Sequence, residues 1–158
     1  IARNMEIYDG AIPSSNSVIL GNLVLLGHLT GDPLYEEQAA RLADSFSGIV
    51  QRSPSAYCAY LCSLDHLLGP AADVVIAGEA TDPVAREMIQ MIRDTYLPSI
   101  TLHCRSLQTS PVLDVLAPFI RSMTPRNGKT TAYICSGRTC SAPVMAPDAL
   151  REALGIKK

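Results

Sequence analysis

Apolar residues recur at three- and four-residue spacing through the first half of the chain, and this period predicts helices. The first expected helix follows the polar cluster 13–17 and ends near Gly31. A second begins at Asp32-Pro33, and a third runs from Ser53-Pro54 to Gly69. Apolar residues surround nearly the whole first helix, so we expect it to be buried on almost all sides. Short loops make consecutive helices antiparallel neighbours.

The pattern changes after Pro70 to short runs rich in β-branched residues, which are typical of buried strands. Residues 73–78 and 99–104 flank an amphipathic helix that opens at 81–83, and such a βαβ unit has parallel strands. A broken helix over 111–120, a third strand over 130–135 and a closing helix from Pro147 to Leu154 follow.

We therefore predict a mixed α and β fold of two segments. Residues 1–69 form antiparallel helices, and residues 70–158 form a small α/β layer with about three strands, packed on the helices. The expected inward stripes of the second and third helices include Ile49 and Leu68, respectively, and Tyr57 and Tyr60 are expected in the core rather than in a sugar-stacking site.

Composition excludes several classes of protein. Among 158 residues, 47% are hydrophobic and 18% charged, with a mean hydropathy of +0.17, which excludes general disorder. The net charge of −2 arises from scattered residues, so no nucleic-acid partner is expected. The longest apolar run, 18–26, is much shorter than the roughly 20 residues that cross a bilayer, so no membrane partner is expected. Without a secretory leader pattern, and with an odd total of five cysteines, we expect a cytoplasmic protein.

Four short motifs, in this order, resemble the end of a known family. They are DGAIPSSNSV at 9–18, LTGDPLY at 29–35, TAYIC at 131–135 and CSAPV at 140–144. The family is that of the YyaL-type thioredoxin-domain proteins, which includes the mammalian spermatogenesis-associated member. The resemblance covers essentially the whole chain.

The resemblance implies that a thioredoxin-like domain precedes an (α/α) toroid similar to six-hairpin glycosidases and N-acylglucosamine 2-epimerases. The present chain then corresponds to the last part of that toroid, and its first residue, Ile1, also indicates a piece of a longer polypeptide. The expected partner is the remainder of that longer chain, meaning the thioredoxin-like domain and the earlier toroid helices. An oligomer through an exposed helical face is a further expectation. We expect a mainly structural C-terminal segment of uncharacterised function that is not catalytic by itself, with no cofactor and no metal.

An enzyme hypothesis rests on the polar loop before the first helix. Asp9, Ser14 and Asn16 could line the cavity of an intact toroid, where they would bind a carbohydrate-like ligand or move a proton during sugar isomerisation. The simpler interpretation is that they cap helices and form turns. His66 could serve as a general base, although a helical histidine is more often packed and hydrogen-bonded.

A redox hypothesis rests on Cys135 and Cys140, which flank a turn at Gly137. The pair could form a disulfide, exchange with other thiols, or bind a metal together with His103 and Cys104. Reduced thiols are the first expectation. Cys58 and Cys62 share one face of the third helix and are expected to be core thiols that cannot bridge each other, because residues at this spacing lie too far apart.

Overall fold

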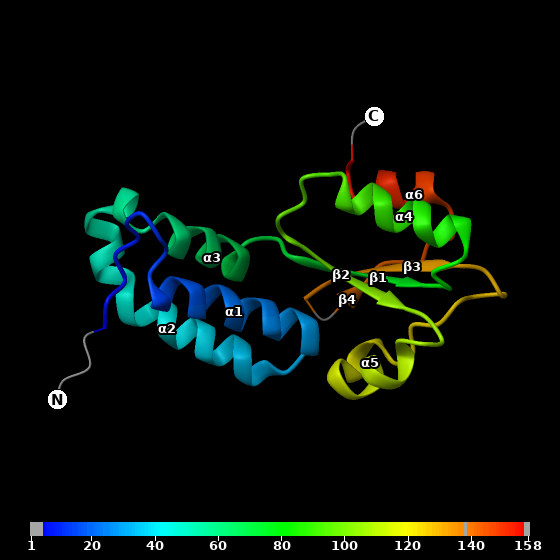
Figure 1. Ribbon diagram of the computed structural model, residues 1–158, viewed down its shortest axis with the longest axis horizontal. Coiled ribbons are helices and arrows are strands. Elements are labelled where there is room, and N and C mark those ends of the chain that lie inside the picture. Colours follow the sequence, from blue (N-terminus) through cyan, green and yellow to red (C-terminus); the bar gives the residue numbers. More distant parts are fainter. Residues whose placement is uncertain (1–4, 138, 157–158) are drawn as a thin grey trace. The chain divides into compact units, whose positions relative to one another are not determined.

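A computed structural model describes residues 5–137 and 139–156 and divides the chain, between Pro70 and Ala71, into two compact units. We call them the helical unit and the α/β unit. The helical unit contains α1 (Ser15–Thr30), α2 (Pro33–Arg52), a 3-10 turn (Pro54–Ala56) and α3 (Cys58–Leu68) (Figure 1). The α/β unit contains β1 (Ala72–Ala77), α4 (Pro83–Arg93), β2 (Ile100–Arg105), α5 (Ser110–Leu116), a 3-10 turn (Pro118–Ile120), β3 (Thr131–Ser136), β4 (Thr139–Cys140) and α6 (Pro147–Ala153).

Local signals place the starts of α1 and α2 where the sequence predicts them. The third helix begins later than predicted, because Pro54–Ala56 form a 3-10 turn and α3 starts at Cys58. The Ser14 side chain accepts a hydrogen bond from the amide of Ser17 at the start of α1, and Asp32 accepts one from Leu34 at the start of α2. Gly31 ends α1 with a φ of 70°, a left-handed conformation that glycine adopts without steric cost. Gly31 and Asp32 together fix the junction between α1 and α2.

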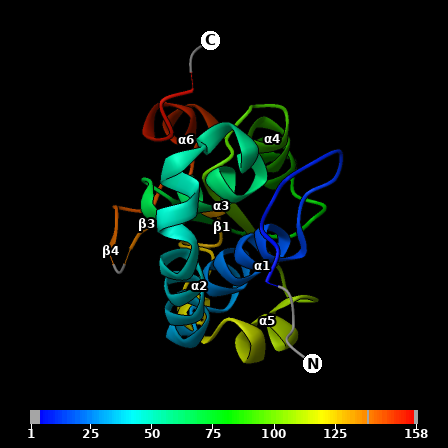
Figure 2. The ribbon, with the colours of Figure 1, turned by 90° about the vertical axis from the view of Figure 1, so that its left-hand side faces the viewer.

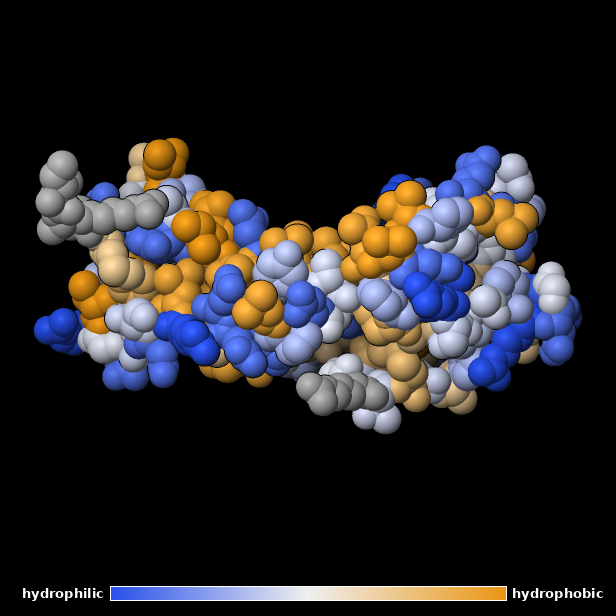
Figure 3. Space-filling view, turned by 90° about the horizontal axis from the view of Figure 1, so that it is seen from below, coloured by the Kyte–Doolittle hydropathy of each residue, from blue (hydrophilic) through white to orange (hydrophobic). Residues whose placement is uncertain are grey.

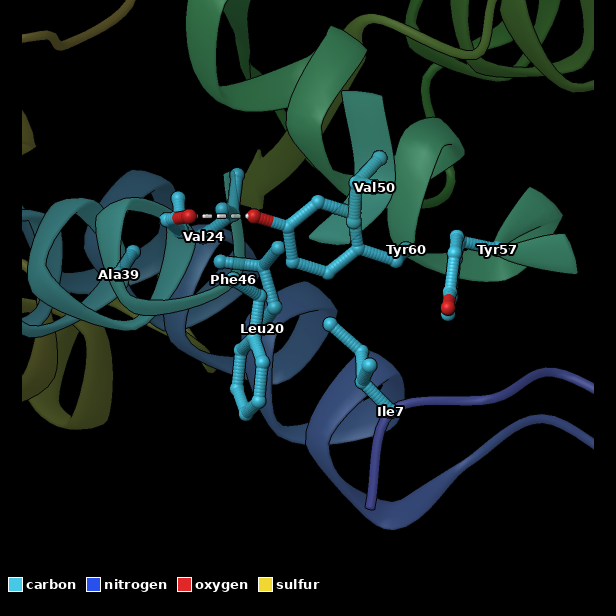
Figure 4. Close-up of a cluster of buried hydrophobic side chains, with 9 residues drawn as sticks. Ile7, Leu20, Val24, Ala39, Phe46, Val50, Tyr57 and Tyr60 are labelled. Carbon is cyan, nitrogen blue, oxygen red and sulfur yellow. Dashed lines mark hydrogen bonds between the residues drawn. The ribbon is translucent and has the colours of Figure 1, made fainter. Parts of the chain in front are cut away.

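The core of the helical unit forms where α1 packs against both α2 and α3, as the close-up in Figure 4 shows. Figure 2 shows α1 beside α2 from another side. Tyr60 is 1% exposed, and its hydroxyl donates a 2.6 Å hydrogen bond to the carbonyl of Ala43. Tyr57 is also buried, so the prediction that both tyrosines belong to the core is confirmed. The buried set is Ile7, Leu20, Val24, Ala39, Ala43, Phe46, Val50, Tyr57 and Tyr60.

The prediction that α1 is buried on almost all sides is wrong for this structure. Only Ser17, Leu20 and Val24 are buried, because α2 and α3 together cover one side of the helix. The uncovered side carries four exposed apolar residues at helical spacing, which we call the α1 stripe. Its members are Val18, Ile19, Leu25 and Leu26.

Two further side-chain orientations differ from the sequence prediction. Ile49 and Leu68 were expected to point inward, but they are 40% and 75% exposed. Cys58 and Cys62 were expected in the core and are exposed free thiols, since Tyr57 and Tyr60 occupy the inward positions around the start of α3. The regular period therefore predicts each helix more reliably than it predicts which side of the helix is buried.

The α/β unit is built on a four-stranded sheet in the order β2-β1-β3-β4. β1 is parallel to β2, as the βαβ pattern predicts, and antiparallel to β3. Five of its six residues are buried, which confirms a strand covered on both faces. β4 is a two-residue edge strand that the sequence did not reveal, so the prediction of about three strands fell one short.

Each face of the sheet has its own apolar core. α4 and α6 cover one face, where Val74, Ile76 and Ala132 pack against Met88 and Leu150. The segment from α5 to Met123 covers the opposite face (Figure 1). We call this opposite face the α5 face; it contains Val75, Ala77, Tyr133 and Cys135. The fold class is thus mixed α and β, as predicted. The packing of the second segment on the first, and the toroid itself, stay predictions.

Candidate functional site

The polar loop before α1 forms hydrogen bonds near the N-termini of two helices, α1 and α3. The carboxylate of Asp9 accepts hydrogen bonds from the amides of Ser14 (2.9 Å) and Tyr60 (3.0 Å). Burial opposes the charged form, but the amide donors outweigh it and hold the pKa of Asp9 below its usual value. Ser14 caps α1, and Asn16 donates a 2.6 Å hydrogen bond to the carbonyl of Glu6. All three residues therefore have a structural role here, and their role toward a carbohydrate stays a prediction.

His66 lies in the last turn of α3 with its ring stacked on that of His28 from the last turn of α1. The ring centroids are 5.2 Å apart and the ring planes differ by 14°. This stacking agrees with a packed histidine. A general-base role for His66 stays a prediction.

Cys135 and Cys140 form a disulfide between β3 and β4. The register pairs them directly across the antiparallel ladder, next to the pair Ser136 and Thr139. The expectation of reduced thiols is therefore wrong: the hairpin that closes at Gly137 brings the two cysteines together, and the sequence did not predict β4. The ring closed by the disulfide is short, so the chain-entropy relation gives a gain of only about 2 kcal/mol, near the low end for a disulfide.

A row of buried polar residues lies beside this disulfide on the α5 face. Asp73 of β1 is the cross-strand partner of Cys135, and Thr101 of β2 is the partner of Asp73 on its other side. His103, two positions along β2, has Nε2 3.7 Å from Oδ1 of Asp73, and its ring meets Phe119 edge-on. All three polar residues are less than 9% exposed.

This polar cluster is unusual for a sheet face because its hydrogen bonding is incomplete. Within the described ranges, Nε2 of His103 and Oγ1 of Thr101 are buried without a hydrogen-bond partner. The sequence indicates His103 only as a metal ligand and gives no site prediction for Asp73 and Thr101. The alternation of polar residues at 101, 103 and 105 in a strand was the signal that could have found them.

Neither Cys135 nor Cys140 offers a free thiolate to a metal in this structure. Their sulfurs are joined to each other, and the described residues contain no group of three or more metal-binding side chains. At the carboxyl end of β1, Glu79 accepts a hydrogen bond from the amide of Leu107, and Asp82 binds the hydroxyl of Thr130 and caps α4. These side chains hold the loops of the α/β unit together.

A groove of about 670 Å³ separates α2 from α3 on the helical unit. Its lining includes the apolar residues Leu61, Leu64 and Leu67 and the charged residues Arg41 and Asp44. α2 and α3 contact each other much less than each contacts α1, which leaves the groove open. Among the described residues, no helix combines the length and the apolar composition needed to span a bilayer.

The fold defines a protein with one helical unit and one α/β unit. Comparison with known proteins identifies relatives of this chain. The chain is 29% identical over 152 residues to spermatogenesis-associated protein 20 of Homo sapiens, an alignment that covers 96% of this chain. The proteins of the same name from Rattus norvegicus and Mus musculus show the same identity over the same share of the chain. The similarity to a spermatogenesis-associated protein, indicated by the motifs, is therefore confirmed.

The chain spans only 19% of the length of these relatives. No protein-family model matches the chain, and no solved structure does. The comparisons thus supply relatives but no reaction, substrate or toroid.

Proposed function

We propose that this chain is a C-terminal part of a longer protein of the thioredoxin-domain family, in which the helical unit packs against earlier helices of an (α/α) toroid. The observation that carries the proposal is the α1 stripe. Four large apolar residues on one side of a helix are 38% to 48% exposed, which is a surface that proteins normally cover. The aligned region makes up only 19% of the human relative. A longer polypeptide of that kind contains other segments that could cover the α1 stripe.

Two other features of the helical unit support the same conclusion. The groove between α2 and α3 is lined by several leucines, and the two helices contact each other much less than each contacts α1. Cys58 and Cys62 are exposed, whereas free cysteine is among the most buried of residue types. Figure 3 shows hydrophobic residues on the surface of the helical unit as seen from below.

Replacing Leu25 and Leu26 by Ala in the longer protein tests the proposal. In the 158-residue chain the double substitution should leave the free energy of unfolding nearly unchanged, because both residues are exposed and alanine favours helix. In the longer protein it should cost about 2 kcal/mol or more for each leucine, because the preceding helices would cover them. Chemical denaturation of both proteins measures the difference.

The matched control is Leu107→Ala in the α/β unit. Leu107 is 81% exposed, so this substitution should leave the free energy of unfolding of both proteins unchanged. Equal and small effects of the double substitution in both proteins would show that no segment of the longer protein covers the α1 stripe. A dimer of the 158-residue chain that the double substitution dissociates, with the longer protein unaffected, would assign the stripe to a second copy and overturn the proposal.

A further inference from the structure

The two sulfurs of the Cys135 and Cys140 disulfide lie in different environments. Cys140 belongs to the two-residue edge strand β4 and is exposed, whereas Cys135 is 4% exposed and belongs to the apolar core of the α5 face. An incoming thiolate must approach one sulfur in line with the bond that breaks. Only Cys140 offers an exposed side chain for this approach, so Cys135 is the natural leaving group.

The leaving sulfur has a group beside it that can exchange a proton. Side chains directly opposite each other in an antiparallel pair have Cβ atoms about 4.5 to 5.5 Å apart, and Asp73 occupies this position opposite Cys135. His103 stands 3.7 Å from the Asp73 carboxylate. Among the described residues, further ionisable groups on this face include Tyr133, whose hydroxyl donates to the carbonyl of Thr124, and Arg105, which pairs with Asp114. The Arg126 guanidinium lies 5.8 Å from the centre of the Tyr133 ring.

The surrounding backbone does not depend on the disulfide. The amide of Ser141 bonds the carbonyl of Ile134, and Ala132 and Val144 exchange two backbone hydrogen bonds. These bonds hold the segment after β4 against β3 whether or not the sulfurs are joined. We therefore expect the sheet to stay folded when the disulfide is reduced.

We propose that Cys135 and Cys140 form a reversible thiol–disulfide exchange site, with Cys140 as the attacked sulfur, Cys135 as the leaving sulfur and Asp73 with His103 as the group that handles its proton. The co-reactant is a dithiol. This activity is separate from the packing role of the helical unit.

One thiolate of the dithiol attacks Sγ of Cys140, forming a mixed disulfide, and the bond between the cysteines breaks with its electron pair on Cys135. The Cys135 thiolate then takes a proton from the Asp73 and His103 pair, which regains it from solvent. The second thiolate of the dithiol attacks the dithiol sulfur of the mixed disulfide, releases Cys140 as a thiolate and closes the co-reactant's own disulfide. The Cys140 thiolate, which is exposed, takes its proton from solvent, and solvent receives the two protons that the dithiol lost when its thiolates formed. Two electrons and two protons have thus passed from the dithiol to the protein.

Glutathione equilibration tests the exchange. The whole protein, with Cys58, Cys62 and Cys104 replaced by serine or alanine, is equilibrated in mixtures of reduced and oxidised glutathione, alkylated and mapped by mass spectrometry. The proposal expects the pair to pass from disulfide to dithiol across the series. It is overturned if the thiols stay free in oxidised glutathione, or if the disulfide persists in excess dithiothreitol.

Single-thiol variants in the same background test the roles. At pH 7, Ellman's reagent should label Cys140 in Cys135→Ser at least about tenfold faster than Cys135 in Cys140→Ser, because burial limits access and thiolate formation. Equal rates, or a faster Cys135, overturn the assignment of attacked and leaving sulfur.

The pH profile of Cys135 labelling tests Asp73. In the Cys140→Ser background, Asp73→Asn should move the midpoint to lower pH, with labelling roughly tenfold faster at pH 7 for a shift of about one pKa unit. Thr101→Val, which alters the neighbouring position without changing charge, should leave the midpoint in place, and circular dichroism should show both variants folded. An unchanged profile in Asp73→Asn, or an equal shift in Thr101→Val, removes Asp73 from the proposal.

Discussion

Asp9 joins two segments that lie far apart in the sequence. Its carboxylate accepts one amide of its own loop and the amide of Tyr60, which is 51 residues away. The charge also lies at the start of α3, where a helix has free amide groups and a positive dipole end. One short side chain thus holds the loop before α1 against α3.

Replacing Asp9 by alanine should lower the free energy of unfolding by about 1 to 2 kcal/mol, the usual cost of losing a helix cap. Urea denaturation followed by circular dichroism measures the change. Glu87→Ala, at an exposed position of α4, is the matched control and should stay within about 0.5 kcal/mol of the parent protein. A loss no larger than that of Glu87→Ala would contradict the capping role.

The same carboxylate makes stability depend on pH. Because the folded-state pKa of Asp9 is lowered, its contribution is present above the unfolded-state pKa of about 3.9 and is lost as the pH falls through the folded-state value. The difference in unfolding free energy between the parent protein and Asp9→Asn should therefore shrink below about pH 4. Denaturation curves between about pH 2.5 and 6 measure it, and a constant difference would contradict the assignment.

At the scale of single residues, the sequence predicted helix caps better than it predicted which residues pair across strands. Ser14 and Asp32 act as caps because a cap depends only on neighbours along the chain. The pairing of Asp73 with Cys135 depends on the register of β1 against β3, which a single strand pattern does not contain. The disulfide was left as one of three alternatives for the same reason, since it needs the unpredicted β4.

Gly78 and Gly48 differ in the space available for a side chain. Gly78 follows β1, and a Cβ there would collide with the side chain of Thr130, which binds Asp82 at the start of α4. Gly48 lies inside α2, and a Cβ there would meet nothing within 4 Å. The first glycine is required by packing, whereas the second only lowers helix propensity.

Substituting alanine at these two positions should change stability in opposite directions. Gly78→Ala should cost about 1 to 3 kcal/mol, because Thr130 must move and its bond to Asp82 is lost. Gly48→Ala should gain up to about 1 kcal/mol. Thermal unfolding of the two variants beside the parent protein measures both, and effects of the same sign would contradict this account.

Periodicity predicted the elements of this chain well but not their exposed sides. α1, α2 and α4 begin near the predicted signals and α1 ends at the predicted Gly31, because caps and prolines act locally. The side of α1 that is buried is set by α2 and α3, and α1 is apolar on several sides, so the sequence could not distinguish the core side from the α1 stripe. The short edge strand β4 has too few residues to produce a period.

The two units should differ in their resistance to unfolding. The sheet has a strand with residues that are 0% to 1% exposed between two apolar cores, while the helical unit is small and has an open groove and an apolar stripe. In hydrogen exchange, amides of β1 and β3 should stay protected after those of α1 and α3 have exchanged. Helix amides that outlast the β1 amides would contradict this order.

The position of β1 between β2 and β3 also has a consequence for synthesis on the ribosome. β2 follows β1 after one helix, so the parallel half of the sheet can form early, whereas the antiparallel neighbour β3 is translated much later. Until β3 is translated, the free edge of β1 has unpaired backbone groups and exposed apolar side chains, which other chains can contact. Truncation before residue 131 should therefore yield a polypeptide that chaperones retain and that precipitates when they are depleted.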